Sequence, residues 1–177
     1  MLSAMMMMMM MMGTASADEI SLEAVLQATP TGELASGLGA RLDSGGAFLT
    51  LEGRGETEGF WIGRATGGID LFGNSERLDV TLGLFLGTTG STTYPTIETA
   101  GTAGFEVGLG ANMGNFRARY RHANGFSGPM ESHLTEDEFR VGYRAFNTVE
   151  LFGQYVRFNP GEYDVIDGYG VGVKVVF

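Results

Sequence analysis

Apolar and polar residues alternate with a period of two along most of the chain after residue 18. No stretch sustains the i, i+3, i+4, i+7 spacing of an amphipathic helix. Successive side chains of a strand point to opposite faces, so this alternation predicts β-strands. The last segment shows it most clearly. One mainly apolar face holds Val165, Asp167, Tyr169, Val171, Val173, Val175 and Phe177, and the other holds Ile166, Gly168, Gly170, Gly172, Lys174 and Val176.

The same alternation recurs upstream. Its clearest segments are 33–42, 47–54, 61–71, 77–86, 105–112, 115–121 and 138–145, and a weaker one covers 20–27. A further strand lies between the connections predicted at 147–148 and 159–164. With the last segment they predict an all-β fold, an up-and-down antiparallel barrel of ten strands. Eight is the alternative count, because a barrel of this kind has an even number of strands and the segment 20–27 is weak.

The connections between these segments fall into two classes. Tight turns rich in Gly and Asn, which accept positive φ, are predicted at 43–45, 73–75, 112–114 and 147–148. Longer connections are predicted at 88–101, 124–133 and 159–164, with shorter ones at 29–32 and 55–58. Tight turns that alternate with longer loops are typical of barrels in the bacterial outer membrane.

The polar faces carry long charged side chains together with glycine. Arg117, Arg119 and Arg121 share one face of a predicted strand, and Glu138, Arg140 and Arg144 share a face of the next. Small residues relieve crowding on the concave side of a narrow barrel, where long charged side chains can pair. This favours an apolar exterior and a polar lumen over a soluble barrel, which remains the alternative. The candidates for interfacial aromatic girdles are Trp61, Tyr120, Tyr143, Tyr155 and Tyr169.

Composition narrows the function classes. The 177 residues include 29 Gly, no Cys and one Lys, and the formal net charge is −10. Nucleic-acid binding needs clustered cations and is disfavoured. Disulfides and thiolate metal sites are excluded, and no cofactor is indicated. A hydrophobic fraction of 44% argues against disorder.

The first residues predict a signal peptide at 1–17 and a barrel domain at 18–177. Eight consecutive Met residues, Met5 to Met12, form an apolar run too short for a membrane helix. Ala15 and Ala17 fit the small-residue rule for cleavage before Asp18. The basic residues that usually precede such a run are missing from residues 1 to 4. Export to the bacterial outer membrane is the expectation.

Of the candidate groups of functional residues, a charge network inside the predicted lumen says most about function. The candidates are Glu106, Arg117, Arg119, Arg121, Glu138, Arg140, Arg144 and Glu150. One hypothesis is a salt-bridged plug that leaves the barrel a structural or surface-interaction protein, since barrels of about eight strands are filled by side chains. The other is a narrow channel for small solutes that prefers anions, because rings of Arg favour anions.

The C-terminal segment, Tyr169 to Phe177, resembles the assembly signal of bacterial outer-membrane proteins. Phe177 ends the chain, Val175, Val173 and Val171 alternate behind it, and Tyr169 is the aromatic residue ninth from the end. The resemblance implies recognition by the barrel-assembly machinery. Other expected partners are outer-membrane lipid and lipopolysaccharide, with the barrel itself a monomer.

Residues 136–177 also resemble the YfaZ-like family of small outer-membrane proteins. The similarity covers Val-Gly-Tyr-Arg at 141–144, Tyr-Val-Arg-Phe at 155–158 and Ile-Asp-Gly-Tyr-Gly-Val-Gly-Val at 166–173. The resemblance implies the fold and the location, and no activity.

His122 raises two minor hypotheses. Lipid A deacylase barrels carry a His on the outer wall with a Ser two residues later. Here that position is Asn124, and Ser127 is displaced, so the nucleophile of a hydrolase is missing. His122 and His133 flank one predicted loop with Glu131 between them, a spacing that matches no recognised metal-ligand pattern. We therefore expect neither a catalytic residue nor a metal site.

Overall fold

The computed structural model describes residues 19–29, 34–56, 60–71, 77–91, 100–127, 132–159 and 165–177. The predicted signal peptide at 1–17 and the predicted turn at 73–75 lie outside the described residues. Within the described part of the chain, no helix is both long and apolar enough to cross a membrane.

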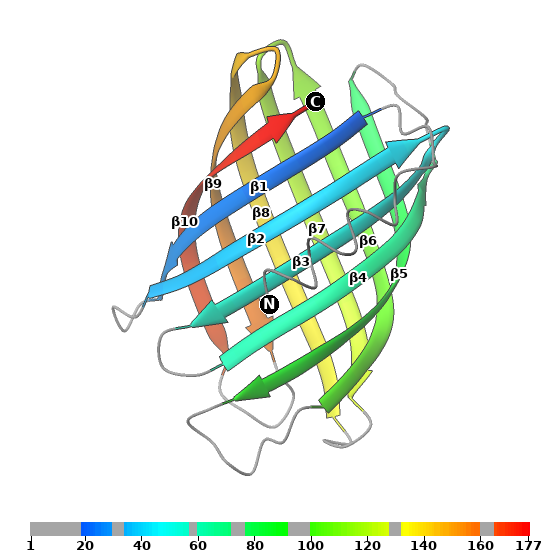
Figure 1. Ribbon diagram of the computed structural model, residues 1–177, viewed down its shortest axis with the longest axis vertical. Helices are drawn as coiled ribbons and strands as arrows, with labels where there is room; N and C mark the ends of the chain where they lie inside the picture. Colours follow the sequence, from blue (N-terminus) through cyan, green and yellow to red (C-terminus); the bar gives the residue numbers. More distant parts are fainter. Residues whose placement is uncertain are drawn as a thin grey trace.

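The described residues form ten antiparallel strands that close into a barrel (Figure 1). They are β1 (Glu19–Ala28), β2 (Leu34–Ser44), β3 (Ala47–Glu56), β4 (Phe60–Asp70), β5 (Leu78–Ser91), β6 (Ala100–Met113), β7 (Phe116–Ser127), β8 (Ser132–Phe146), β9 (Val149–Asn159) and β10 (Ile166–Val176). Each strand pairs with its neighbours in sequence, and β1 also pairs with β10. The prediction of ten strands is confirmed, and the alternative count of eight is wrong because the weak segment at 20–27 forms β1 and closes the wall.

The two ends of the barrel differ. One end, which we name the turn end, holds Glu19, Phe177 and the tight connections β2–β3, β6–β7 and β8–β9. It lies toward the top of Figure 1, beside the marker of the C-terminus. Gly45, Gly46 and Gly114 have positive φ values of 58°, 83° and 62°, as the first two of these turns require. The opposite end is named the loop end.

Four strands run further toward the loop end than the sequence predicts. β5 extends to Ser91 and β6 begins at Ala100, while β7 extends to Ser127 and β8 begins at Ser132. The predicted connections 88–101 and 124–133 are therefore wrong at their ends. Backbone pairing continues there without an apolar face to mark it, as at Thr89, which pairs with Ala100. Both of these side chains are buried.

The two faces of the wall are inverted relative to a soluble protein. Large apolar side chains lie on the outside, and Leu84, the most exposed of them, is 73% exposed. The buried residues include thirteen polar or charged ones: Ser21, Gln27, Arg64, Thr66, Thr81, Thr89, Thr102, Glu106, Arg121, Glu136, Glu138, Glu150 and Gln154. Soluble proteins almost never bury Arg and Glu in such numbers. The predicted assignment of the faces is therefore confirmed.

Glycine makes room for three aromatic rings inside this narrow lumen. A Cβ atom on either Gly104 or Gly125 would lie 2.6 Å from Cζ of Phe85, so that ring rests directly on two glycines. Phe48 lies in the same way against Gly68 and Gly83, and Phe152 against Gly172. An arginine covers each ring, with the guanidinium carbon 4.0 to 5.1 Å from the ring centroid: Arg41 over Phe48, Arg64 over Phe85 and Arg140 over Phe152.

Gly104→Ala is expected to destabilise the barrel by about 1–3 kcal/mol, the usual cost of overpacking. Its Cβ would meet Phe85, the Cα of Gly125 at 2.5 Å and the carbonyl oxygen of Asn124. Gly101→Ala in the same strand is the control, since a Cβ there meets nothing within 4 Å. Denaturant unfolding of both variants in micelles measures the difference. Equal stability of the two variants would contradict the close packing around Phe85.

Candidate functional site

An ion-pair cluster fills the middle of the lumen. We name it the plug and define it as Glu52, Arg54, Arg64, Arg121, Glu136 and Glu138. Arg121 lies at its centre, with nitrogen–oxygen distances of 2.8 Å to Glu52, 2.6 Å to Glu136 and 3.0 Å to Glu138. A longer contact of 3.6 Å joins it to Glu106.

The plug ties opposite sides of the wall together. Glu52 and Arg54 come from β3, whereas Glu136 and Glu138 come from β8. These two strands face each other, because the strand order places them equally far apart in both directions around the barrel. Arg54 crosses the lumen to reach both Glu136 and Glu138 at 3.0 Å. From β4, Arg64 pairs with Glu52 and, at 3.2 Å, with Glu136.

Apart from Arg54, whose side chain is 21% exposed, the charged side chains of the plug are largely buried. The side chains of Glu136 and Glu138 are 4% and 5% exposed, and that of Arg64 is 5% exposed. A charge at such a depth is tolerated when it is paired and hydrogen-bonded, and removing one partner leaves the other uncompensated. Arg140 extends the network, with contacts of 3.1 Å to Glu138 and 2.7 Å to Glu23. Each charge of the plug therefore depends on its partners, so the loss of one side chain affects the others.

Beyond the plug, toward the loop end, the described lumen is packed. Phe85, Ala123, Leu134 and Phe158 are buried there. Two cavities on this side of the plug have volumes of about 20 Å³ each. Such a volume is close to that of a single water, so each of these two cavities holds about one water.

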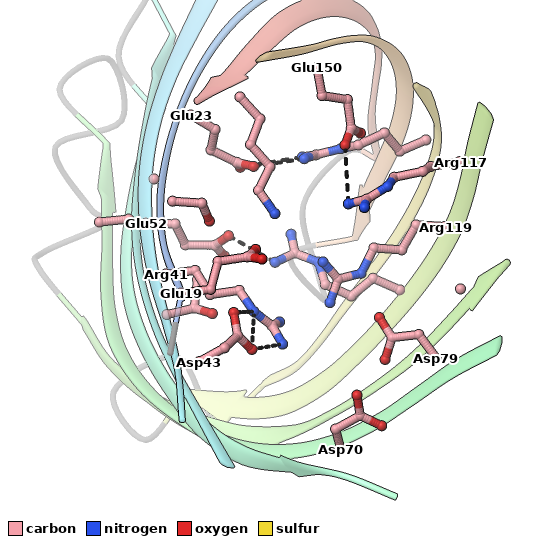
Figure 2. A pocket seen from close by; sticks show the side chains of 18 of the residues that line it. Glu19, Glu23, Arg41, Asp43, Glu52, Asp70, Asp79, Arg117, Arg119 and Glu150 are labelled. Atoms are coloured by element: carbon pink, nitrogen blue, oxygen red, sulfur yellow. Dashed lines mark hydrogen bonds and ion pairs between the residues drawn. The ribbon is translucent and has the colours of Figure 1, made fainter. Parts of the chain in front are cut away.

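A larger cavity of about 330 Å³ opens on the other side of the plug (Figure 2). We name it the vestibule. It reaches the turn end, since Ser44, Gly45 and Asn112 belong to its lining, while Glu52, Arg121 and Glu138 of the plug form its floor. Nine acidic and six basic residues line it. The open part of the described lumen therefore lies between the plug and the turn end, and its entrance is at the turn end.

The residues of the predicted charge network divide between these two regions. Arg121 and Glu138 belong to the plug, and Arg140 and Glu106 contact it. Arg117 and Glu150 form a separate pair at 3.4 Å in the vestibule. Arg119 and Arg144 form no ion pair with any described residue.

Sequence reasoning missed five members of the network: Glu23, Glu52, Arg54, Arg64 and Glu136. Glu52, Arg54 and Arg64 alternate with apolar residues, which places them on inward faces. Their meeting with β8 across the lumen depends on the register of ten strands, which alternation does not reveal. Glu136 precedes the predicted start of its strand and falls within β8.

His122 lies on the outer face of the wall and inside β7, although the predicted strand at 115–121 ends before it. Its Nδ1 is 2.9 Å from Oδ1 of Asp137, and the hydroxyl of Tyr120 donates to the same oxygen at 2.6 Å. A hydrolase needs a nucleophile beside this His–Asp pair. Asn124 occupies the position where that serine is expected, and Ser127 is the last residue of β7.

The described residues contain no group of three or more His, Cys, Asp or Glu that could hold a metal ion. His122 and His133 lie on neighbouring strands but are paired with different residues, Asp137 and Phe126. Glu131, the third member of the metal hypothesis, lies outside the described residues.

Comparison with known proteins shows the fold. No family model matches the chain, and no curated protein matches its sequence. The NanC porin is similar in structure, with a TM-score of 0.51 at 9% identity over 88% of this chain and 98% of that chain. An anion-selective porin from Comamonas acidovorans gives a TM-score of 0.49 at 12% identity over 81% of this chain. This chain spans 49% of that porin, about half its length. The N-terminal β-barrel domain of Pseudomonas aeruginosa OprF gives 0.46 at 10% identity over 91% of this chain and 98% of that domain. At such identities the likeness concerns the fold: the chain shares the closed antiparallel barrel of porins and small β-barrel proteins.

Proposed function

We propose that the protein is an outer-membrane barrel with a closed lumen, and that it serves the bacterial envelope as a structural or surface-interaction protein. The plug is the observation that carries this proposal, because its ion pairs join opposite walls and place charged side chains across the middle of the described lumen. A channel needs a path that ions can cross. No catalytic role is proposed.

The exterior supports a membrane location. On the outer face of β8, the apolar stretch lies between Asp137 and Asn147. The ten steps of about 3.3 Å from one residue to the next, tilted by about 40°, span about 25 Å along the barrel axis, which matches the apolar band of outer-membrane barrels. The wall therefore fits the hydrocarbon layer in height as well as in polarity.

Aromatic side chains mark the edges of this band. Tyr120, Phe139, Tyr155 and Tyr169 are register partners in one row across β7 to β10. The next outward row toward the loop end is polar and consists of His122, Asp137, Arg157 and Asp167. Toward the turn end, the rings of Phe116 and Tyr143 pack 5.1 Å apart. Aromatic belts beside charged rows are typical of the two membrane interfaces.

The difference between the two ends of the barrel supports an orientation in the membrane, and the position of the last strand supports the predicted assembly signal. Barrels of this kind have short turns on the periplasmic side, so we place the turn end and the vestibule there. Tyr169, Val171, Val173, Val175 and Phe177 all lie on the outer face of the last strand or directly after it. They are available to the assembly machinery as the C-terminal resemblance implies. The segment of the YfaZ-like resemblance, 136–177, forms most of β8 and all of β9 and β10, and membership of that family remains our hypothesis.

Leu84→Arg is expected to destabilise the protein in lipid bilayers by about 2–4 kcal/mol, the cost of Arg near the middle of the hydrocarbon layer. Leu84→Ala is the control for lost apolar area. Unfolding by guanidinium in vesicles measures both variants. If Arg and Ala at this position have the same effect in vesicles, the outer face does not contact lipid.

Bilayer recording tests the closed lumen. The unaltered protein is expected to give no current steps. Replacing one central pair, Arg121→Ser with Glu138→Ser, removes two long side chains without changing the net charge and is expected to produce steps. The matched control is Arg117→Ser with Glu150→Ser, which makes the same change in the vestibule, leaves the plug intact and should stay silent.

A specific observation keeps a narrow anion channel as the second candidate. Two cations of the vestibule, Arg119 and Lys174, form no ion pair with a described residue. Steps from the unaltered protein, with a reversal potential that favours chloride, would replace the closed-lumen proposal by this one. Steps from the vestibule control alone would show that the plug is not the barrier.

A further inference from the structure

The vestibule holds charges of both signs that have no ion-pair partner in the part of the chain that the structure describes. Arg119 on β7 and Lys174 on β10 form no ion pair with a described residue, and neither does Asp79 on β5. Asp79 Oδ1 also lacks a hydrogen-bond partner among the described groups. All three side chains line the same cavity. In the plug, by contrast, every charged side chain has a partner.

Geometry keeps Arg119 and Asp79 near each other. Asp79 is the register partner of Gly110, and Gly110 is the register partner of Arg119. Both charged residues therefore face the lumen from strands on either side of β6, and Gly110, which lies between them, has no side chain. Figure 2 shows them projecting from one side of the wall into the cavity. The gap at Gly110 is narrow, since a Cβ there would lie 3.1 Å from the Cβ of Asp79.

The balance of charge indicates which ligand suits this cavity. The lining has nine acidic and six basic residues, so its net negative charge repels a simple anion. A simple cation is repelled by Arg119 and Lys174. A molecule that carries both charges can satisfy both sets at once, with charge-assisted hydrogen bonds at each end. The volume of about 330 Å³ equals about eleven waters at ~30 Å³ each, which accommodates a molecule of amino-acid size.

We propose that the vestibule binds a small zwitterion, with its carboxylate at Arg119 and Lys174 and its ammonium group at Asp79. The plug forms the floor of this site, and the turn end is its entrance. The inference goes beyond the closed-lumen function and does not depend on it, because binding is measured in micelles whether or not the barrel conducts.

Calorimetric titration of the unaltered protein with three matched probes tests the proposal. L-alanine carries both charges, propionate lacks the ammonium group, and ethylammonium lacks the carboxylate. L-alanine is expected to bind at least tenfold more tightly than either of the others at the same ionic strength. Propionate binding as tightly would show an anion site, and ethylammonium binding as tightly would show a cation site. Either result, or no binding of L-alanine, would overturn the proposal.

Variants locate the site. Arg119→Gln and Asp79→Asn are each expected to weaken L-alanine binding at least tenfold. Arg157→Gln is the control, since Arg157 is a cation on the outer wall and its side chain is 57% exposed. Unchanged affinity for L-alanine in both vestibule variants would show that the ligand does not bind at Arg119 and Asp79, and would overturn the proposed site. Should either variant fail to fold, the comparison of probes on the unaltered protein still decides the question.

Discussion

The structure depends on one constraint: a barrel of ten strands must place the charged side chains that lie level with its apolar outer band in a narrow lumen, where the charges of the plug are one another's partners. Charged groups in such a space are stable when they are paired. Arg121 contacts four glutamates from three other strands, and Arg54 reaches across to the opposite wall. These contacts fix the strands relative to one another in addition to the backbone ladder. They also divide the lumen into a packed half and an open half.

Space for this arrangement comes from glycine. At Phe48, Phe85 and Phe152, each ring lies between glycine of the wall and an arginine on its other side. A side chain at Gly104 or Gly172 would push the ring toward the axis and displace the arginine above it. The glycines beside these rings are therefore a requirement of packing a charged interior at this diameter, and they complement the pairing of charges in the plug.

The sequence predicts most of this fold because alternation is a local property. A strand shows its two faces within a few residues, so the ten strands and the inward faces of Arg121, Glu138 and Arg140 follow from the pattern. Strand ends do not, because the backbone ladder continues past the apolar face at Thr89 and at Asn124. Contacts across the lumen are not local either. Glu52 and Arg121 are in contact only because of the register between every pair of neighbouring strands from β3 to β7. A single sequence carries no direct signal for the combined effect of these registers. The vestibule was missed for the same reason.

The pairing of β1 with β10 has a consequence for how the protein folds. Ser21 pairs with Val176 and Ala28 with Tyr169, so the contact that closes the wall joins nearly the most distant parts of the described chain. The entropic cost of closing so long a loop must be met before the ladder between these strands returns any stability. Every intermediate that lacks this last contact exposes two strand edges, each a template for pairing with another chain. Closure is thus the step at which a growing sheet stops being prone to aggregation, and it requires both ends of the barrel sequence to be present together.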